Sequence, residues 1–261
     1  MPSILSFPRI TRRAGKVWQR NLDVFFKTWK VNFFPPFIEA LLYLTAIGLG
    51  IGTYVGAING VPYIDYIAPA VLAISVMNSA FFECTYGSYV RMYYQKSFDA
   101  IIATPLSIED VIAGELLWGA TRSVISVTIM LPVLAVFGVI SLPFSLLAIP
   151  LAFLGGLTFA GLAMCFTAIT PSIDTLNYPS FLLITPMMLF SGTFFPLSIL
   201  PAILQYVALA IFPLTHLVAL MRMATLPSIG ALLPLNIAWI IIATIIFCII
   251  SINLMRRRLI V

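Results

Sequence analysis

Charged side chains are scarce in this sequence: Asp, Glu, Lys and Arg make up 9% of its 261 residues, whereas 61% are hydrophobic. A typical soluble domain carries about 25% charged residues. With a mean hydropathy of +1.09, the chain cannot enclose its apolar surface in one water-soluble core, so lipid must cover part of it. Crossing a hydrocarbon layer of about 30 Å takes roughly 20 apolar residues, so six spans would use about half of the chain.

Residues that bind metals or act as nucleophiles are also few. The sequence has one histidine, His216, and its three cysteines, Cys84, Cys165 and Cys248, lie in separate apolar stretches without the close spacing of a metal site or a CxxC pair. No HExxH segment and no nucleophile elbow occurs. We therefore expect no catalytic residue, no metal site and no disulfide.

A nucleotide-binding loop is missing as well. Gly15-Lys16 is followed by Val17 instead of Ser or Thr, and no glycine precedes Gly15 by five positions. The Walker A pattern, in which glycines and a lysine cradle phosphates, is therefore not met. We expect the chain to bind no cofactor and to hydrolyse no nucleotide by itself.

The basic residues are concentrated at the two ends of the chain. Seven of the fourteen Lys and Arg precede Asn32, and three more are Arg256, Arg257 and Arg258. A net charge of +5 can indicate a nucleic-acid partner in a soluble protein, but basic residues beside membrane helices mark the cytoplasmic side. The distribution predicts a multi-pass protein of the inner membrane with both termini in the cytoplasm and no nucleic-acid partner.

Hydrophobic periodicity predicts an all-α polytopic membrane protein with six transmembrane helices. The apolar runs place these spans at about 33–57, 67–90, 111–137, 143–169, 176–195 and 232–254. Basic and aromatic residues alternate over 9–30, which predicts an amphipathic helix that either lies in the cytoplasmic interface or only anchors the first span. Gly48, Gly52 and Gly56 would let another helix approach the first span, within the chain or between subunits.

The stretch 196–222 does not fit a regular span. Pro196, Pro201 and Pro213 cut it into apolar pieces of about 12 and 10 residues, which are too short to cross a bilayer. Counting it as a further span would also place the C-terminal arginines outside. We therefore predict a re-entrant outer hairpin before the last span. At membrane depth, protein groups or a water-filled cavity must supply hydrogen-bond partners for the backbone of such a hairpin.

The loop over 91–110 is the longest predicted cytoplasmic loop. Ser107 with Asp110 three residues later is the pattern of a capping box, so a helix should start there and continue as the third span. A short helix over about 95–103 should precede it.

Four ionisable residues fall inside the predicted spans, namely Glu39, Glu83, Glu115 and Arg122. Each such charge costs about 2.5–3.5 kcal/mol on insertion scales unless it is paired or hydrated. Glu39 and Glu83 lie at similar depth, which would permit a shared cavity on the cytoplasmic side, whereas Glu115 and Arg122 are seven residues apart, too far for a direct ion pair. The four charges either pair across helices for assembly or line a path for an anionic or amphipathic substrate.

Several segments carry a family resemblance that covers nearly the whole chain. They are Phe82-Glu83-Cys84-Thr85-Tyr86 leading to Arg91-Met92, Ile112-Ala113-Gly114-Glu115, Leu189-Phe190-Ser191-Gly192-Thr193-Phe194-Phe195-Pro196, Pro213-Leu214-Thr215-His216 before Arg222, and the terminal Arg256-Arg257-Arg258-Leu259. With these segments the chain resembles the ABC type-2 transporter permeases and looks closest to the nodulation lipo-oligosaccharide exporter permeases (NodJ-like). At 103–107 it follows the general type-2 pattern more than the nodulation subgroup.

The resemblance implies a single ABC type-2 transmembrane domain over 1–261, a permease dimer, and two copies of an ABC ATPase subunit that bind ATP and Mg²⁺ and dock on the cytoplasmic face. It implies export of an amphipathic substrate, such as a lipid-linked saccharide, a lipo-oligosaccharide or a hydrophobic drug-like molecule. Membrane lipids and this substrate are thus further expected partners. It also implies a coupling helix in the loop over 91–110. The candidate docking residues are Lys96, Phe98, Asp99, Thr104, Pro105, Leu106 and Ser107.

Two other functions remain open at this point. A multipass membrane enzyme acting on lipids could use Glu39, Glu83 or Arg122, although the sequence has no clustered acid, base or metal-ligand set. A proton-coupled secondary transporter could use the same carboxylates, but such proteins normally show internal repeats and more spans.

Overall fold

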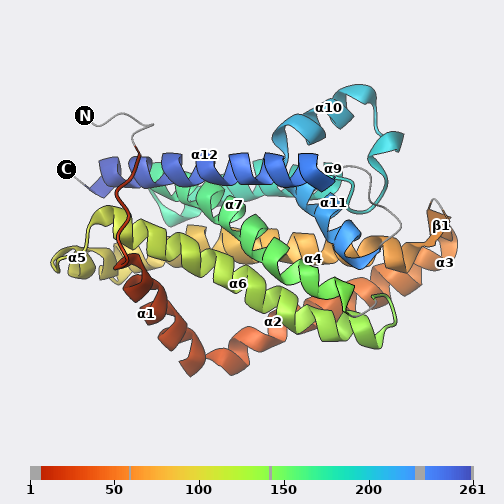
Figure 1. The fold of residues 1–261 in the computed structure, drawn as a ribbon, viewed down its shortest axis with the longest axis horizontal. Helices are drawn as coiled ribbons and strands as arrows, with labels where there is room; N and C mark the ends of the chain where they lie inside the picture. Colours follow the sequence, from red (N-terminus) through yellow and green to blue (C-terminus); the bar gives the residue numbers. More distant parts are fainter. Residues whose placement is uncertain (1–6, 59, 141–142, 227–232, 260–261) are drawn as a thin grey trace.

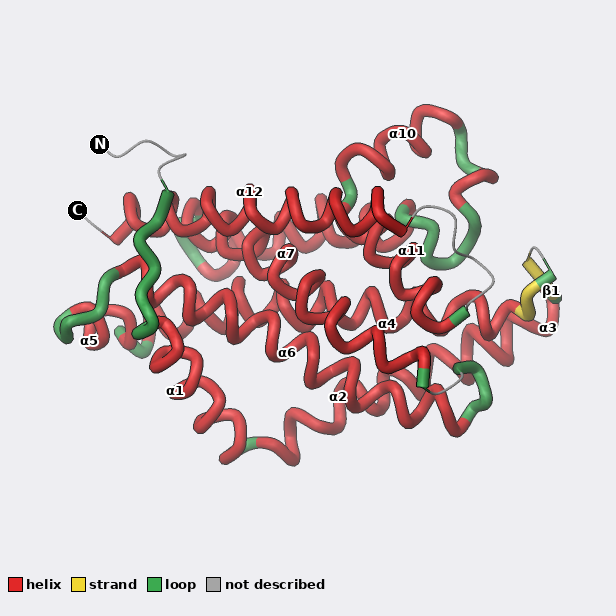
Figure 2. Tube along the Cα trace, viewed as in Figure 1, coloured by secondary structure: helices red, strands yellow, loops and turns green. Residues whose placement is uncertain are grey.

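The computed structural model describes residues 7–58, 60–140, 143–226 and 233–259, and nearly all of them are helical. The long helices lie side by side along the longest axis of the molecule (Figure 1), and helix dominates the trace (Figure 2). The sheet within the described residues is a small antiparallel hairpin of β1 (Ala57–Ile58) and β2 (Val61–Pro62). The predicted all-α fold is confirmed.

Helix α1 (Ala14–Lys27) is separate from the first span, because Thr28 interrupts the helix before α2 begins at Trp29. The predicted amphipathic segment 9–30 contains this helix, although it begins only at Ala14. The buried residues Ala14, Val17 and Asn21 follow at intervals of three and four, so they share one helical face. That face packs on α6 (Ile108–Val136).

The first span is one helical run of 27 residues, Trp29–Val55. It consists of α2 (Trp29–Leu42), the π-helical segment η1 (Tyr43–Ile51) and α3 (Gly52–Val55). Because the run starts at Trp29, Pro35 and Pro36 lie beyond the first turn, inside the helix. At these positions the two prolines remove two backbone N–H donors from the helix. A Cβ on Gly48 would lie 2.7 Å from Cγ1 of Ile64, so this glycine serves packing within the chain.

The second span is a run of 32 residues, Tyr63–Tyr94. It contains α4 (Tyr63–Phe82) and the π-helical segments η2 (Glu83–Gly87) and η3 (Val90–Tyr94). The run extends beyond the expected range of 67–90 at both ends. Arg91, which the sequence analysis assigned to a loop, is therefore part of a helix.

Helix α5 (Ser97–Ile102) follows and precedes α6, at the place expected for a short helix. The predicted capping box is confirmed: Asp110 N donates to Ser107 Oγ at 3.1 Å, and Ser107 N donates to Asp110 Oδ2 at 3.4 Å. These two bonds satisfy backbone donors at the start of the third span, which is why α6 begins at Ile108.

After α6, the chain returns through η4 (Phe144–Leu147) and α7 (Ala148–Ile169). Residues 173–190 then form four short helical segments, η5 (Ile173–Leu176), α8 (Asn177–Pro179), η6 (Ser180–Ile184) and α9 (Thr185–Phe190). Near their start, Tyr86 donates to Asn177 Oδ1 at 2.7 Å, and just after their end, Tyr66 donates to Gly192 O at 3.2 Å. The stretch expected as a span at 176–195 thus runs along the second span, from its last turns to its first, as an irregular helix.

The expected outer hairpin consists of η7 (Leu197–Ile199), α10 (Ala202–Ile211) and α11 (Pro213–Thr225), with α10 and α11 bent by 85°. The first half of α11 is inserted in the core, since Leu214 and Leu217 have no exposed surface. Its last turn is back at the first turns of α4, where Arg222 stacks on Tyr66. Helix α12 (Leu233–Leu259) completes the fold; expected residue 232 of this span lies outside the described residues.

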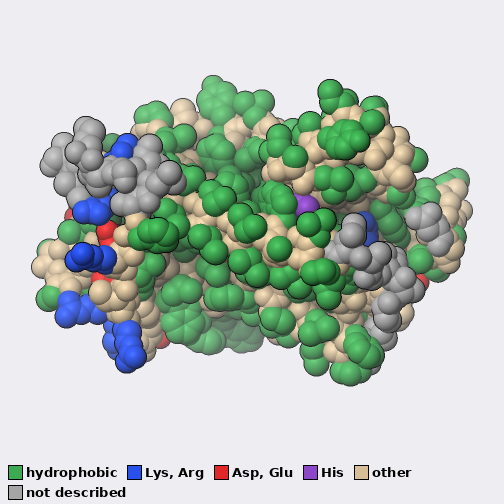
Figure 3. Space-filling view, turned by 45° about the horizontal axis from the view of Figure 1, so that its top comes forward, with side chains coloured by type: hydrophobic (Ala, Val, Ile, Leu, Met, Phe, Trp, Pro, Cys, Tyr) green, Lys and Arg blue, Asp and Glu red, His purple; other side chains and the backbone are tan. Residues whose placement is uncertain are grey.

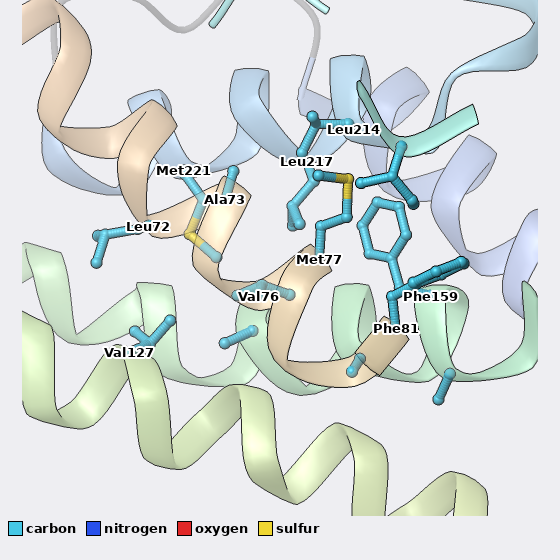
Figure 4. Close-up of a cluster of buried hydrophobic side chains, with 14 of the residues drawn as sticks. Leu72, Ala73, Val76, Met77, Phe81, Val127, Phe159, Leu214, Leu217 and Met221 are labelled. Carbon is cyan, nitrogen blue, oxygen red and sulfur yellow. The ribbon is translucent and has the colours of Figure 1, made fainter. Parts of the chain in front are cut away.

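Helix α4 forms the centre of the bundle. In the most apolar stretch of each helical run, the share of buried residues is 78% for Tyr63–Tyr94, 22% for Trp29–Val55 and 33% for Leu233–Leu259. Figure 4 shows Met77 and Phe81 of α4 packed with Phe159 of α7 and Leu217 of α11. The outer spans leave broad apolar surfaces exposed, as expected of helices that face lipid.

Five single helical runs in the described residues are long and apolar enough to cross a membrane, and there are six only if the bent pair α10–α11 counts as one span. The span expected at 176–195 is not among the five runs, because that stretch is divided into short helical segments. Lys and Arg gather at one end of the molecule (Figure 3), near α5. We call this end, which carries residues 9–13, α5 and the last turn of α12, the basic end. Hydrophobic side chains cover much of the rest of the face that Figure 3 shows.

Candidate functional site

A cluster of five charged side chains lies where α1 packs on the bundle near the basic end. It contains Glu83 of η2, Arg91 of η3, Glu115 and Arg122 of α6, and Arg20 of α1. We call these five residues the charged cluster. Three of the four intramembrane charges predicted from the sequence, Glu83, Glu115 and Arg122, are therefore brought together from the second and third spans.

Glu115 is the buried centre of this cluster, with no exposed surface. Its Oε2 accepts hydrogen bonds from Arg91 Nη2 at 2.6 Å and from Ser88 Oγ at 2.7 Å. Its Oε1 accepts from Asn21 Nδ2 at 2.8 Å and lies 3.5 Å from Arg20 Nη2. Both oxygens are thus satisfied, as a buried carboxylate requires, and α1 is tied to the second and third spans.

Glu83 is shared between two arginines. Arg91 Nη1 donates to Glu83 Oε1 at 2.8 Å, and the indole of Trp118 donates to the same oxygen at 2.9 Å. Arg122 Nε lies 3.4 Å from Glu83 Oε2 without a hydrogen bond. Glu115 and Arg122 form no ion pair with each other, in agreement with the seven-residue spacing.

Helix α1 approaches α6 closely enough to require a glycine. A Cβ on Gly114 would lie 2.5 Å from Val17 Cβ and 2.8 Å from Ala14 O. The residue after Val17 adds a hydrogen bond: Trp18 Nε1 donates to Thr121 Oγ1 at 2.8 Å. Burial lowers the pKa of the Arg20 guanidinium from its ordinary value, and the charge of Glu115 acts in the opposite direction.

The charged cluster borders a cavity of about 320 Å³ under the elbow between α1 and α2. Its charged lining residues are Arg20, Glu83, Arg91 and Arg122. Three arginines therefore face one carboxylate, and Glu115 is the only other carboxylate that contacts these arginines within the described residues.

Glu39 lies apart from this cluster. Ser75 of α4 donates to its Oε2 at 3.2 Å, and it lines an apolar groove of about 580 Å³ along the first span, together with Phe34, Ile38 and Tyr43. Glu83 lines a different cavity, so the shared cavity expected from similar depth is wrong. Ser75, the partner of Glu39, precedes Glu83 by eight residues of the second span, which is about 12 Å along the helix axis, so the two carboxylates lie at different levels.

The candidate docking residues are not equally accessible. Lys96, Asp99, Thr104, Pro105 and Ser107 are exposed and Leu106 is half-buried. Phe98 has no exposed surface and belongs to the hydrophobic core, so its expected role in docking is wrong. The first turn of α5 points this ring inward, because an apolar ring gains more from burial than from exposure at a loop.

Two tyrosines next to α5 were not predicted. Tyr93 and Tyr94 are 57% and 65% exposed, and Tyr93 stacks on Tyr89 at 5.3 Å between ring centroids. Lys96 then adopts φ = 50°, in the left-handed region, which turns the chain sharply into α5. Exposed aromatic rings at a turn are frequent in protein interfaces.

Both described ends of the chain meet at the start of α6. The backbone N of Arg9 donates to Glu109, and Arg256 Nη1 of α12 lies 3.0 Å from Glu109 Oε1. The next residue, Asp110, accepts from Thr11 N at 2.6 Å. The segment that follows α5 is thus held by the N-terminal stretch and by the last span.

At the opposite end, Arg222 organises the turn before the outer hairpin. Its guanidinium lies 3.9 Å from the centroid of the Tyr66 ring, and its Nη2 donates to Gly192 O at 2.6 Å and to Thr193 O at 3.3 Å. Gly192 has φ = 73°, which its missing side chain permits. Backbone carbonyls and an aromatic ring here replace the carboxylate that usually accompanies a buried arginine.

His216 joins the outer hairpin to the last span. Its Nδ1 lies 2.8 Å from Asn236 Oδ1, its Nε2 lies 2.9 Å from Leu209 O, and its ring stacks on Trp239 at 4.3 Å. Both ring nitrogens already have hydrogen-bond partners. The arrangement is that of a packing residue and not of a metal ligand.

The sequence analysis missed Arg20, Asn21, Arg91 and Trp118. Arg91 was missed because the second span was ended at Val90. A signal was available, since Glu83 inside the span needs a cation and Arg91 follows it about two helical turns later. Arg20 and Asn21 could not be found in this way, because their partner Glu115 lies 94 or more residues away in the chain.

Comparison with known proteins agrees with this architecture. The chain matches the family described as ABC-2 type transporter over residues 14–226. It is 34% identical to nodulation protein J of Sinorhizobium fredii over 243 residues, which cover 93% of this chain and 92% of that protein. Nodulation protein J of Rhizobium meliloti is 35% identical over the same shares.

A further relative is the inner membrane transport permease YadH of Escherichia coli, which is 25% identical over 202 residues, 72% of this chain and 73% of that protein. The family match extends from α1 to the end of α11. The chain belongs to the ABC-2 type transporter family and is a multi-pass inner-membrane permease subunit of an ABC exporter.

Proposed function

We propose that this permease exports an amphipathic molecule, and that separate ABC ATPase subunits, which bind ATP and Mg²⁺, drive it by docking at the basic end. The observation that carries this proposal is an exposed helical loop between the second and third spans of an ABC-2 permease chain. The basic end then faces the cytoplasm, because Lys and Arg beside membrane helices remain on that side. Both termini accordingly lie in the cytoplasm.

Helix α5 is the coupling helix in this proposal. The exposed residues Asp99 and Ala100 of α5 form the surface that an ATPase subunit contacts, together with the exposed residues that precede the helix, namely Tyr93, Tyr94 and Lys96. The buried Phe98 fixes the helix to the body of the permease. A push on α5 is therefore transmitted to the core and is not lost in a flexible loop.

The second and third spans receive this push together. Helix α5 lies between them in the chain, and Arg91 of the second span is hydrogen-bonded to Glu115 of the third. A buried, fully satisfied network of this kind holds its members in one arrangement. The two spans consequently move as one unit relative to α12 and the outer hairpin.

The substrate and the assembly follow from the likeness to nodulation proteins J and from the surface of the chain. A lipid-linked saccharide, a lipo-oligosaccharide or a hydrophobic drug-like molecule combines a polar and an apolar part. Such a molecule matches a permease that has a charged cavity next to apolar grooves. Two copies of this chain and two ATPase subunits form the transporter, with the substrate passing between the two permeases.

Substitution on the exposed face of α5 tests the docking. We expect Ala100→Arg to abolish both co-purification of the ATPase and ATP-driven transport of a lipo-oligosaccharide into inverted vesicles, because a long charged side chain occupies the contact surface. Gln19→Arg, on an exposed position of α1, is the matched control and should retain both. A complex that forms and transports normally with Ala100→Arg would refute the assignment.

A further inference from the structure

The cavity under the elbow between α1 and α2 carries a surplus of positive charge. Arg20, Arg91 and Arg122 line it together with a single carboxylate, Glu83. Even when the buried Glu115 is counted, three cations face two anions. A network that served only to hold helices together would be neutral, since an extra charge near the membrane is costly.

The surplus is located at Arg122. Arg91 and Arg20 both contact Glu115, and Arg91 also takes the shorter contact with Glu83. The Nε of Arg122 is buried without a hydrogen bond, and its guanidinium lies 5.2 Å from the centroid of the Phe25 ring. Its contact with Glu83 Oε2 is 3.4 Å long, and an arginine paired this weakly on a cavity wall is suited to a bidentate anion such as phosphate.

A second cavity continues the first in the direction of the membrane. It has a volume of about 350 Å³ and a wall of apolar side chains, namely Phe25, Phe26, Trp29, Phe33, Ile125 and Ile129. Phe25 lines both cavities, so they adjoin.

One face of α6 runs past both cavities. Trp118 and Arg122 line the charged one, and Ile125 and Ile129 line the apolar one. Their spacing of four, three and four residues keeps them on one side of the helix. At a rise of 1.5 Å per residue, the face extends about 16 Å from Trp118 to Ile129. A polar half and an apolar half of this length fit a headgroup and the first part of an acyl chain.

We propose that these two cavities form one binding site for an anionic amphiphile, with a phosphate-type headgroup held by Arg122 and its neighbours and the chain held among the aromatic rings of α1 and α2. The site rests on the proposed function and names the chemistry of its substrate. Gln95 and Ser97, at the start of the coupling helix, line the headgroup cavity. A bound headgroup therefore touches the segment through which the ATPase acts.

Binding is measured on the full chain in phosphatidylcholine nanodiscs with radiolabelled hexadecyl phosphate as the probe. Hexadecanol has the chain without the charge, and inorganic phosphate has the charge without the chain. We expect hexadecyl phosphate to bind at least about tenfold more tightly than either competitor, since hydrogen bonds to a charged group are strong and the chain adds apolar contact. Equal competition by hexadecanol, or by inorganic phosphate, would overturn the proposal.

Variants test the two halves separately. Arg122→Gln should weaken binding of hexadecyl phosphate about tenfold, and Arg122→Lys should recover part of the loss. Ile129→Trp, which fills the apolar cavity, should weaken hexadecyl phosphate but not butyl phosphate. Lys27→Gln, an exposed basic position of α1 that lines neither cavity, is the matched control.

Unchanged binding by Arg122→Gln in a protein that elutes as a folded species would refute the headgroup assignment. If Arg122→Gln does not fold, Arg122→Lys keeps the charge without the bidentate geometry, and binding of hexadecyl phosphate that is unchanged in this variant would refute the assignment as well. Because binding is measured without the ATPase, it is independent of whether Ala100→Arg disrupts docking. Failure of one experiment thus leaves the other informative.

Discussion

Removal of the buried carboxylate at Glu115 is the most direct test of the charged cluster. In Glu115→Ala, Arg91 loses its contacts at 2.6 and 2.9 Å, and Asn21 and Ser88 lose their acceptor. Arg91 retains Glu83, but one buried positive charge is no longer balanced. Breaking a buried ion pair by removing one partner costs about 3–5 kcal/mol, so we expect a loss of that size in the free energy of unfolding.

The melting temperature of the purified permease in detergent is the readout. A change of 1 kcal/mol shifts the melting temperature by about 2–4 °C in a chain of this size, so Glu115→Ala should melt roughly 6–20 °C lower. Glu115→Gln keeps part of the hydrogen bonding and should lose less. Asp23→Asn is the matched control, because Asp23 is exposed on α1.

A double-mutant cycle separates the ion pair from the loss of volume. Arg91→Met alone should destabilise the protein, and Arg91→Met combined with Glu115→Leu should lose clearly less than the sum of the two single changes. A melting temperature of Glu115→Ala within about 2 °C of the unchanged protein, or strictly additive effects in the cycle, would refute the view that this network is a stabilising buried pair.

Two further substitutions follow from the packing. Gly114→Leu places a side chain where Val17 Cβ lies and should displace α1, so that trypsin cleaves α1 several-fold faster, whereas Gly15→Ala, with open space around it, should not; equal rates would contradict the docking of α1. Arg222→Met should release the carbonyl of Gly192 and lower the free energy of unfolding by about 1.5–3 kcal/mol, with faster hydrogen exchange over 191–195; unchanged exchange there would contradict this role.

Local patterns in the sequence predicted the elements that depend on local physics. The capping box at Ser107 and Asp110 is confirmed because both partners lie within one turn. The outer hairpin was predicted from prolines alone, since a helix interrupted twice cannot cross the bilayer, and α10 and α11 are indeed bent by 85°. Apolar length also predicted the regions of the five single runs, whereas the stretch 176–195 is divided into short helical segments.

Predictions of contacts between helices were less accurate. Depth along a span placed Glu39 beside Glu83, but the two face different cavities. The family resemblance placed Phe98 among the docking residues, but the ring is buried. The partner of Glu115 on α1 lies far away in the sequence, and no periodicity connects Asn21 with α6. Side-chain depth and polarity are local quantities, whereas orientation about the helix axis is set by packing partners.

The charge balance of the cluster separates its structural from its functional part. Glu115 with Arg91, Ser88 and Asn21 is a closed set in which each group has a short hydrogen bond, and it accounts for why α1 stays on the bundle. Arg122 lies outside that set: its contact with Glu83 Oε2 is 3.4 Å long and has no hydrogen bond through Nε, whereas Glu83 Oε1 already accepts hydrogen bonds from Arg91 and Trp118. A charge that stability does not require, on the wall of a cavity that reaches the coupling helix, is accounted for by a ligand of opposite charge. The same physical cost that makes buried charges rare thus identifies Arg122 as the residue to test for substrate binding.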